Sequence, residues 1–380
     1  MDEHVSLLTY NKTTHRWEGE DPETHLRLWM SEKTFERYVW RYLSDQHICQ
    51  PLSGDVERAR QQCRQFSYWQ GCTDRKVHWI TPERELADKR KENEVEANKK
   101  NGYVLDPESP TELARLIMLD RAITTSMGGI MVGIPSDLVL HNALDLACGP
   151  GGWVLDMAFE HPGVEVAGVD ISQQMISYAY ARARTQQLPN ASFGVMDITE
   201  PLDFGDGTFD VINARFLVGV LKGAQWSALL SECFRLLRPG GVIRLVESDG
   251  LVISTSTSLT RLQQYLLRAM QGRGYGFAVQ GGETLGITPL LPRMLAQAGF
   301  EPHSLPWMFD FSSTSPHSAD GLHLCEVVYQ LAAQQHLFDD QLRERGESVD
   351  FLIRDMLIEM QQTDFCALNY GLTVSAVKPM

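Results

Sequence analysis

Between residues 141 and 250, short apolar runs alternate with helical patterns, and this alternation restricts the possible folds more than any other feature. The apolar runs have the length of single strands, and turns rich in glycine or proline separate them from the helices. Alternation of this kind predicts a parallel sheet with helices on both faces. The expected strands are 141–146, 164–169, 192–196, 208–213 and 242–247, and the helices between them end near residues 160, 187 and 237.

The C-terminal part adds two strands and two helical insertions to this sheet. Residues 302–311 and 367–377 are predicted to pair antiparallel at the sheet edge. The sheet then has seven strands, of which the last is antiparallel. Helical patterns predict insertions near 251–300 and 312–365, so the expected core domain covers residues 141–380.

Residues 1–100 differ in character from the core and hold five of the eight tryptophans. In the segment 25–43, Leu28, Phe35, Val39 and Tyr42 follow one another at seven, four and three residues, the spacing of an amphipathic helix. We therefore expect a mainly helical N-terminal extension. It could act as a second lid, as the arm of a homodimer or as a partner-binding domain.

Residues 101–140 are expected to form a helical cap next to the core. Ser109 can cap a helix, Pro110 suits its first turn, and Glu112 can complete a capping box. The helix is predicted to span residues 110–125 and to stop before a pair of glycines.

The charge and the cysteines limit the partners of this chain. Residues 101–380 carry 17 basic and 31 acidic side chains of a chain whose net charge is −15, so nucleic acid is disfavoured and a small-molecule substrate is favoured. The seven cysteines lack the spacing of a disulfide framework, which favours a cytoplasmic location. No membrane span or secretory signal is expected. The cysteines and histidines between residues 47 and 78 match no metal-binding spacing, so no metal is expected.

A glycine-rich turn, Asp145-Leu-Ala-Cys-Gly-Pro-Gly-Gly152, joins the first core strand to the first helix. Such a turn lets the backbone approach a ligand closely and directs N–H groups of the helix terminus at it. Asp170 ends the second strand and Asp197 the third, at the edge where open α/β sheets bind ligands. These carboxylates can accept hydrogen bonds from ribose hydroxyls and an exocyclic amine, and Ile171 can pack on a base. Together they predict a nucleotide site.

The same residues resemble sequence motifs of class I S-adenosylmethionine (SAM)-dependent methyltransferases. The glycine-rich turn is similar to their motif I, and Val169-Asp-Ile-Ser172 is similar to the acidic motif of their second strand. Residues 196–198, 204–211 and 234–241 resemble the stretches that follow in ubiquinone-biosynthesis-type and related small-molecule methyltransferases. The resemblance implies a Rossmann-like fold and SAM as the cofactor.

For the turn, the resemblance implies contacts with the methionine part of SAM. The backbone of Gly149 and Gly151 would lie along it, and Ala147 replaces a more usual glycine. Asp145 would order the turn or contact the SAM ammonium.

For the later strands, the resemblance implies contacts with the nucleoside and the reacting centre. Asp170 would hold the ribose, and Asp197 with the backbone of Ile198 would bind the adenine. Asn213 would lie near the sulfonium. In the cap, Tyr103 is expected to close over SAM, and Arg121 is expected either to bind its carboxylate or to be a solvated helix residue.

Two other functions remain open at this point. A dinucleotide dehydrogenase would also use a glycine turn, but its third glycine would stand where this chain has Val154. A SAM-binding regulator or scaffold that no longer methylates would keep the same motifs, because fold alone does not establish activity.

The acceptor and the catalytic group are less constrained than the cofactor. Methyltransferases that act on bases or protein glutamine carry an Asn/Asp-Pro-Pro-aromatic tetrad, whereas residues 213–216 read Asn-Ala-Arg-Phe, so an oxygen, carbon or small-molecule nitrogen acceptor is favoured. Aromatic residues in the insertions suggest an apolar or aromatic acceptor. The candidates for a general base are Glu247, Tyr275, His317, His323 and Glu326.

Overall fold

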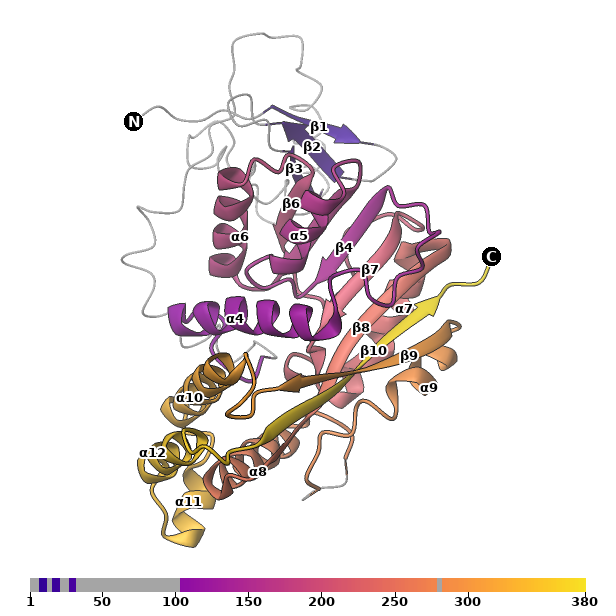
Figure 1. Cartoon of the computed structure of the whole chain (residues 1–380). Helices are drawn as coiled ribbons and strands as arrows, with labels where there is room; N and C mark the ends of the chain where they lie inside the picture. Colours follow the sequence, from indigo (N-terminus) through magenta and orange to yellow (C-terminus); the bar gives the residue numbers. More distant parts are fainter. Residues whose placement is uncertain (1–6, 12–15, 21–26, 32–102, 279–281) are drawn as a thin grey trace, which may run out of the picture.

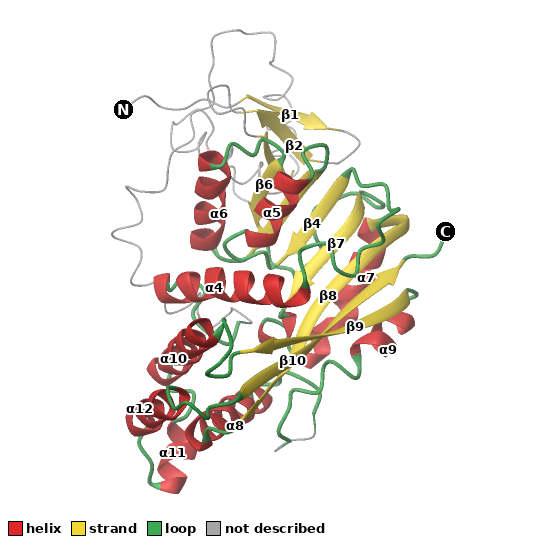
Figure 2. Cartoon of the chain, in the orientation of Figure 1, coloured by secondary structure: helices red, strands yellow, loops and turns green. Residues whose placement is uncertain are grey.

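The computed structural model describes residues 7–11, 16–20, 27–31, 103–278 and 282–380, and it is an α/β protein (Figures 1 and 2). The core strands are β4 (Asn142–Leu146), β5 (Glu165–Asp170), β6 (Ala191–Val195), β7 (Phe209–Arg215), β8 (Leu237–Ser254), β9 (Glu301–Asp310) and β10 (Ala367–Val377). They form one seven-stranded sheet in the order β6-β5-β4-β7-β8-β10-β9. β4 to β8 run parallel, and β10 runs antiparallel to both of its neighbours. The predicted fold class is confirmed.

Helices cover both faces of the sheet, as the alternating pattern predicts (Figure 1). They are α4 (Pro110–Met127), α5 (Gly152–Glu160), α6 (Gln173–Thr185), α7 (Trp226–Leu236), α8 (Thr257–Gly272), α9 (Leu291–Gln297), α10 (Ser318–Gln334), α11 (Asp339–Arg345) and α12 (Val349–Met360), with 3₁₀ turns η1 (Leu217–Gly219) and η2 (Gly223–Gln225). The Ser109 hydroxyl accepts a hydrogen bond from the Glu112 N–H and Pro110 occupies the first turn of α4, as expected. The predicted capping box is not completed, because the Glu112 carboxylate binds Tyr103 and Arg115 and the Ser109 N–H donates to the Asp106 carbonyl. The helix ends at the C-cap residue Gly128, whose φ of 88° lies in the left-handed region that glycine adopts most easily.

Adjacent residues of the central strands enter different apolar clusters. On β4, Ala143 packs in the cluster that includes α5 and α6, and Leu144 packs in the cluster that includes α7 and α9. Both side chains are completely buried. A parallel strand covered on both faces is apolar at nearly every position, which is why the strands appear in the sequence as continuous apolar runs.

The insertions form a helical lobe beside the sheet. α8, α10 and α12 lie together beyond the carboxyl end of β8 and the amino end of β10 (Figure 2). Trp307, Phe309, Phe338 and Met356 are buried in the cluster that joins this lobe to β9. The aromatic residues of the insertions are therefore mainly core.

β8 is longer than the strand predicted at 242–247, because it pairs with β10 from Val242 to Ser254. The Arg238-Pro-Gly-Gly241 turn forms the irregular start of the strand, where the register with β7 shifts. Gly240 has a φ of 76° there, a conformation that costs glycine little.

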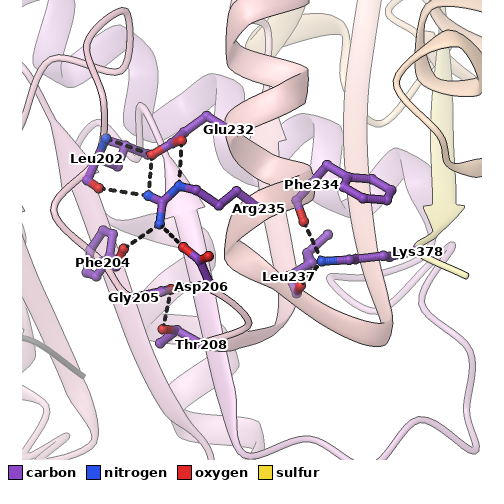
Figure 3. Close-up of polar contacts among 10 residues, drawn as sticks. All are labelled: Leu202, Phe204, Gly205, Asp206, Thr208, Glu232, Phe234, Arg235, Leu237 and Lys378. Carbon is purple, nitrogen blue, oxygen red and sulfur yellow. Dashed lines mark hydrogen bonds and ion pairs between the residues drawn. The ribbon is translucent and has the colours of Figure 1, made fainter. Parts of the chain in front are cut away.

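The motif stretches 204–211 and 234–241 meet at the amino-terminal ends of β7 and β8 (Figure 3). The Arg235 guanidinium forms an ion pair with Asp206 at 2.6 Å and one with Glu232 at 2.5 Å, and it also donates to two backbone carbonyls. The Lys378 ammonium donates to the carbonyls of Phe234 and Leu237, each at 2.7 Å. Arg235 joins α7 to the turn before β7, and Lys378 joins the C-terminal segment to the end of α7, so both residues stabilise the fold.

The described residues of the N-terminal extension are strands. β1 (Leu7–Asn11), β2 (Arg16–Glu20) and β3 (Arg27–Ser31) form an antiparallel sheet. The helix expected over residues 25–43 is therefore wrong at 27–31, where pairing with β2 provides the backbone partners that a helix would otherwise supply. The rest of the extension lies outside the described residues.

Candidate functional site

A cavity of about 250 Å³ lies at the carboxyl ends of the parallel strands, under α4. The chain builds the sheet outward from β4 to β6 and then crosses to β7, so the strand order reverses between β4 and β7. Open α/β sheets bind ligands at such a reversal. The lining comprises Tyr103, Pro107, Leu116, Leu119, Asp120, Asp145, Ala147, Cys148, Gly149, Pro150, Gly152, Asp170, Ile171, Met175, Met196, Asp197, Ile198, Thr199, Arg215, Phe216, Val220, Lys222 and Gln225.

The glycine-rich turn forms the floor of this cavity. Ala147, Gly149 and Gly151 all have positive φ values, of 50°, 52° and 76°. A methyl group built on Gly149 would meet only Leu116 of α4, at 3.7 Å, so a ligand in the cavity can approach the Gly149 backbone closely. Gly151 is different, because a Cβ on it would lie 2.7 Å from the Phe193 ring, and it is absent from the lining. The absence of a side chain at Gly151 is needed for packing, and a ligand contact of its backbone stays a prediction.

Asp170 holds the turn and faces the cavity at the same time. One carboxylate oxygen accepts the Gly149 N–H at 2.8 Å, and the other accepts the Ser172 N–H at 2.9 Å. The side chain is 9% exposed, and burial raises the pKa of this carboxyl although both N–H groups oppose the shift. Since each oxygen can accept more than one hydrogen bond, the carboxylate can still bind two hydroxyls. Ile171 lines the cavity beside it.

Asp197 and Ile198 lie at the end of β6, on the far wall. Asp197 is exposed, and one of its oxygens accepts from the Thr199 N–H at 2.9 Å and from the Thr199 hydroxyl at 2.7 Å. The Ile198 side chain is buried in the core while the residue lines the cavity. The predicted adenine site therefore has a fixed carboxylate and an accessible backbone.

Asn213 lies behind the cavity and does not line it. It is completely buried, and its amide donates to Asp145 at 2.7 Å and accepts from Arg244 at 2.5 Å. Asp145 does line the cavity, and burial raises its pKa to about 7 against the opposing charge of Arg215. Asn213 was predicted to lie near the reacting centre; the structure shows that it supports Asp145.

Arg215 and the exposed Lys222 are the cationic residues of the cavity lining, and sequence reasoning missed the less exposed one, Arg215. Arg121 is exposed on α4 and absent from the lining, whereas Arg215 lines the cavity with an 11% exposed side chain. Its guanidinium forms an ion pair with Asp120 at 2.5 Å and donates to the Thr124 hydroxyl at 3.1 Å. Burial opposes its charge, but Asp120 and Asp145 outweigh burial and raise its pKa. The available signal was its position as the last residue of β7, at the strand-order reversal.

Tyr103 lines the cavity as expected of a lid residue. Its hydroxyl donates to the Glu112 carboxylate at 2.5 Å, and Arg115 binds both oxygens of the same carboxylate at 2.7 Å. Glu112 is completely buried. This network fixes the Tyr103 ring against α4.

Comparison with known proteins assigns the chain to a family. Residues 143–241 match a family described as "Methyltransferase domain". "Methyltransferase pytC" of Aspergillus terreus is 29% identical over 283 residues, which cover 72% of this chain and 82% of that protein. A demethylmenaquinone methyltransferase of Thermus thermophilus is 30% identical over 177 residues, which cover 43% of this chain and 78% of that protein. The chain belongs to the class I SAM-dependent methyltransferases. Among solved structures, phosphoethanolamine N-methyltransferase 2 of Haemonchus contortus is 19% identical with a TM-score of 0.42, and the match covers 70% of this chain and 57% of that one.

The methyltransferase therefore uses SAM and transfers its methyl group to a small-molecule acceptor. A dehydrogenase and a non-methylating scaffold are not favoured. The residues of the cavity fit the cofactor: the bare backbone at Gly149 accepts a close ligand, Asp170 offers acceptors for hydroxyls, and Arg215 offers a cation for a carboxylate. Within the described residues, no helix has the length and apolarity that a membrane span requires.

None of the predicted general bases lines the cavity of the methyltransferase. Glu247 is completely buried and accepts the N–H groups of Leu217 and Val218, at 2.7 and 3.3 Å, and burial raises its pKa to about 8. Tyr275 is 5% exposed in the core beside η2, and burial raises its pKa.

The three candidates on or next to α10 also lie away from the cavity. His323 and Glu326 share a helix face as predicted, with 3.9 Å between the imidazole and the carboxylate, and both are partly exposed. His317 precedes α10, 3.5 Å from Asp320. Among the residues that the structure describes, no cluster of histidine, cysteine and acidic side chains could hold a metal ion.

Proposed function

We propose that the methyltransferase binds SAM along the cavity, with the adenine at Asp197 and Ile198 and the amino acid end at Arg215. Asp170 then lies between them, where its two oxygens accept the ribose hydroxyls. Asp145 contacts the ammonium group. The order of these residues along the strand ends matches the order of the chemical groups in SAM, and this correspondence carries the proposal.

Arg215 takes the role that the sequence suggested for Arg121. A guanidinium binds a carboxylate with two parallel hydrogen bonds, and a partly desolvated one does so more strongly than an exposed one. Asp120, which pairs with Arg215, is placed to bind the ammonium group from α4. α4 thus caps the cofactor with a carboxylate and with the apolar side chain of Leu116, which lies over Gly149.

We infer that the acceptor is an apolar or aromatic small molecule. The part of the cavity next to Arg215 is walled by Leu119, Phe216 and Val220, and Phe216 packs edge-on against Trp307 with ring centroids 6.2 Å apart. Such a wall favours flat apolar ligands. Several relatives are named for demethylmenaquinone as their substrate, which supports the same class.

Orientation, rather than proton removal, accounts for the chemistry on this proposal. When bound, SAM supplies a methyl group activated by its sulfonium. Asp145, Asp170 and Arg215 hold the cofactor at three points, and α4 excludes water, so the acceptor meets the methyl group in line. The general-base candidates His317, His323, Glu326, Glu247 and Tyr275 have no part in it.

A radiolabelled methyl-transfer assay with a panel of acceptors tests the acceptor class. Hydroxyquinones and phenols should be methylated as anions that have already released their proton to solvent, and small amines and amino acids should not. Leu119→Gln should raise KM for the acceptor while the Kd for SAM stays within about twofold, because the new amide is desolvated against an apolar ligand. The matched control is Ala114→Gln on the exposed side of α4, which should leave both constants unchanged. Preferential methylation of amines would overturn the proposal.

The remaining partner assignments rest on the sequence. The acidic balance of residues 101–380 supports the absence of a nucleic acid substrate, and the unpaired cysteine spacing supports a cytoplasmic location. A homodimer through residues 1–100 stays a prediction. Sedimentation of the full chain and of a chain lacking those residues would test it, together with cell fractionation for the location.

A further inference from the structure

Arg244 is a charged side chain in the middle of the sheet, and burying such a group requires compensation. It is completely buried on β8. Its guanidinium donates to the Val132 carbonyl at 2.7 Å and to the Asn213 side chain at 2.5 Å, and it contacts the Met127 sulfur at 3.8 Å. In the part of the chain that the structure describes, no carboxylate forms an ion pair with it.

A carboxylate compensates this charge through one intermediate residue. Asn213 accepts from Arg244 and donates to Asp145, so an amide joins the buried cation to an acid of the cavity. In a region of low dielectric, the two charges still stabilise each other across this amide. The amide also has a fixed orientation, because only one of its ends can accept and only the other can donate.

The same guanidinium holds the segment that follows the cap helix. Val132 lies between α4 and β4, and Met127 is the last residue of α4. The Thr373 hydroxyl also contacts the Met127 sulfur, at 3.6 Å, and the Trp153 indole donates to the Ile130 carbonyl at 3.2 Å. The end of the cap helix is therefore attached to the sheet beneath the cavity.

We propose that Arg244 is a positioning residue of the cofactor site, which fixes the Asp145 carboxylate through Asn213 and the end of α4 through the Val132 carbonyl. One buried cation then sets the acid on the floor of the cavity and the helix that covers it. The proposal rests on the proposed contact between Asp145 and SAM. Arg244 touches neither SAM nor the acceptor.

The pH dependence of cofactor binding separates this role from a purely structural one. Asp145 faces Arg215 from β7, Asp120 from α4, the Cys148 thiol of the turn and Arg244 from β8. Burial and Asp120 raise the pKa of Asp145, and the two arginines lower it. Because the carboxylate form binds the ammonium group, SAM affinity should rise with pH through the pKa of Asp145. Loss of Arg244 should move that midpoint upward.

The experiment is calorimetric titration of the full chain with S-adenosylhomocysteine between pH 5.5 and 9. Arg244→Met keeps the volume and removes the charge, and it should raise the midpoint by about one pH unit. Arg238→Met is the matched control, because it removes an arginine from the start of the same strand, 2.7 Å from Asp210 and away from the cavity. It should leave the midpoint unchanged. An unshifted midpoint in Arg244→Met, with a lowered Tm, would overturn the proposal.

Two further measurements keep the outcomes distinct. If Asp145→Asn retains the wild-type pH profile, the proposed contact between Asp145 and SAM fails, whatever Arg244 does. If Arg244→Met does not fold, NMR of the wild-type chain gives the answer. The Asn213 side-chain amide and the Arg244 Nη1–H group that donates to it should then titrate with one common midpoint, and an Arg244 signal that does not follow Asn213 would refute the coupling.

Discussion

Replacement of Arg215 should weaken cofactor binding in a way that depends on the amino acid end of SAM. Arg215 is nearly buried and lines the cavity. Arg215→Met therefore removes the proposed charge-assisted, two-bond contact with the carboxylate of SAM. It also leaves Asp120 without its ion-pair partner, at a place where that carboxylate would repel the carboxylate of the cofactor. Two such bonds contribute about 2–4 kcal/mol, which corresponds to a roughly 30- to 1,000-fold weaker Kd.

The assay is calorimetric titration with two ligands and two variants. S-adenosylhomocysteine carries the carboxylate, and 5′-methylthioadenosine lacks the whole amino acid end. Arg215→Met should lose affinity for the first and keep it for the second within about threefold. Arg121→Met is the control, because this arginine is exposed and outside the cavity. The reasoning is refuted if Arg215→Met loses both ligands equally, or if Arg121→Met shows the selective loss.

Two predictions concern stability. Gly151→Ala should lower the free energy of unfolding by about 2–4 kcal/mol, because a positive φ and a 2.7 Å approach to Phe193 are both unfavourable for a Cβ. The control is Gly163→Ala, which has no atom within 4 Å of the new Cβ and should be near neutral in the same denaturant titration. Equal losses in the two variants would contradict this account. Glu247 has a folded pKa of about 8, above its unfolded value, so the folded state holds the extra proton and this group makes the protein less stable as pH rises from about 5 to 8. Urea unfolding at several pH values should show a shallower decline for Glu247→Gln than for the wild type, and parallel curves would argue against a neutral Glu247.

The core of the fold could be predicted because it depends on local signals. Strands buried on both faces give continuous apolar runs, and the start of α4 is determined by Ser109 and Pro110 within one turn. The N-terminal strand Arg27–Ser31 was missed because its backbone bonds come from β2, and helical spacing in one segment contains no information about a partner strand.

The site residues that could be predicted are the aspartates at the ends of strands. Asp170 ends β5 and Asp197 follows the end of β6 by two residues, so their place followed from the strand pattern. The arginine that faces the cavity could not be identified in this way. Whether Arg121 of the helix or Arg215 of the strand points into the cavity depends on how each element is rotated about its axis, and the sequence does not state that rotation. Asn213 and Arg244 were hidden for a related reason: their roles depend on contacts between strands far apart in the sequence.

The central claim is that SAM binds in this cavity through Asp170. Calorimetric titration of the wild type and of Asp170→Ala with SAM and with S-adenosylhomocysteine tests it most directly. The account predicts micromolar binding by the wild type and at least a roughly 30-fold loss in the variant, because the carboxylate accepts the Gly149 N–H and, on this proposal, also the ribose hydroxyls. Equal affinity in the two proteins, or no binding by the wild type, would contradict the account.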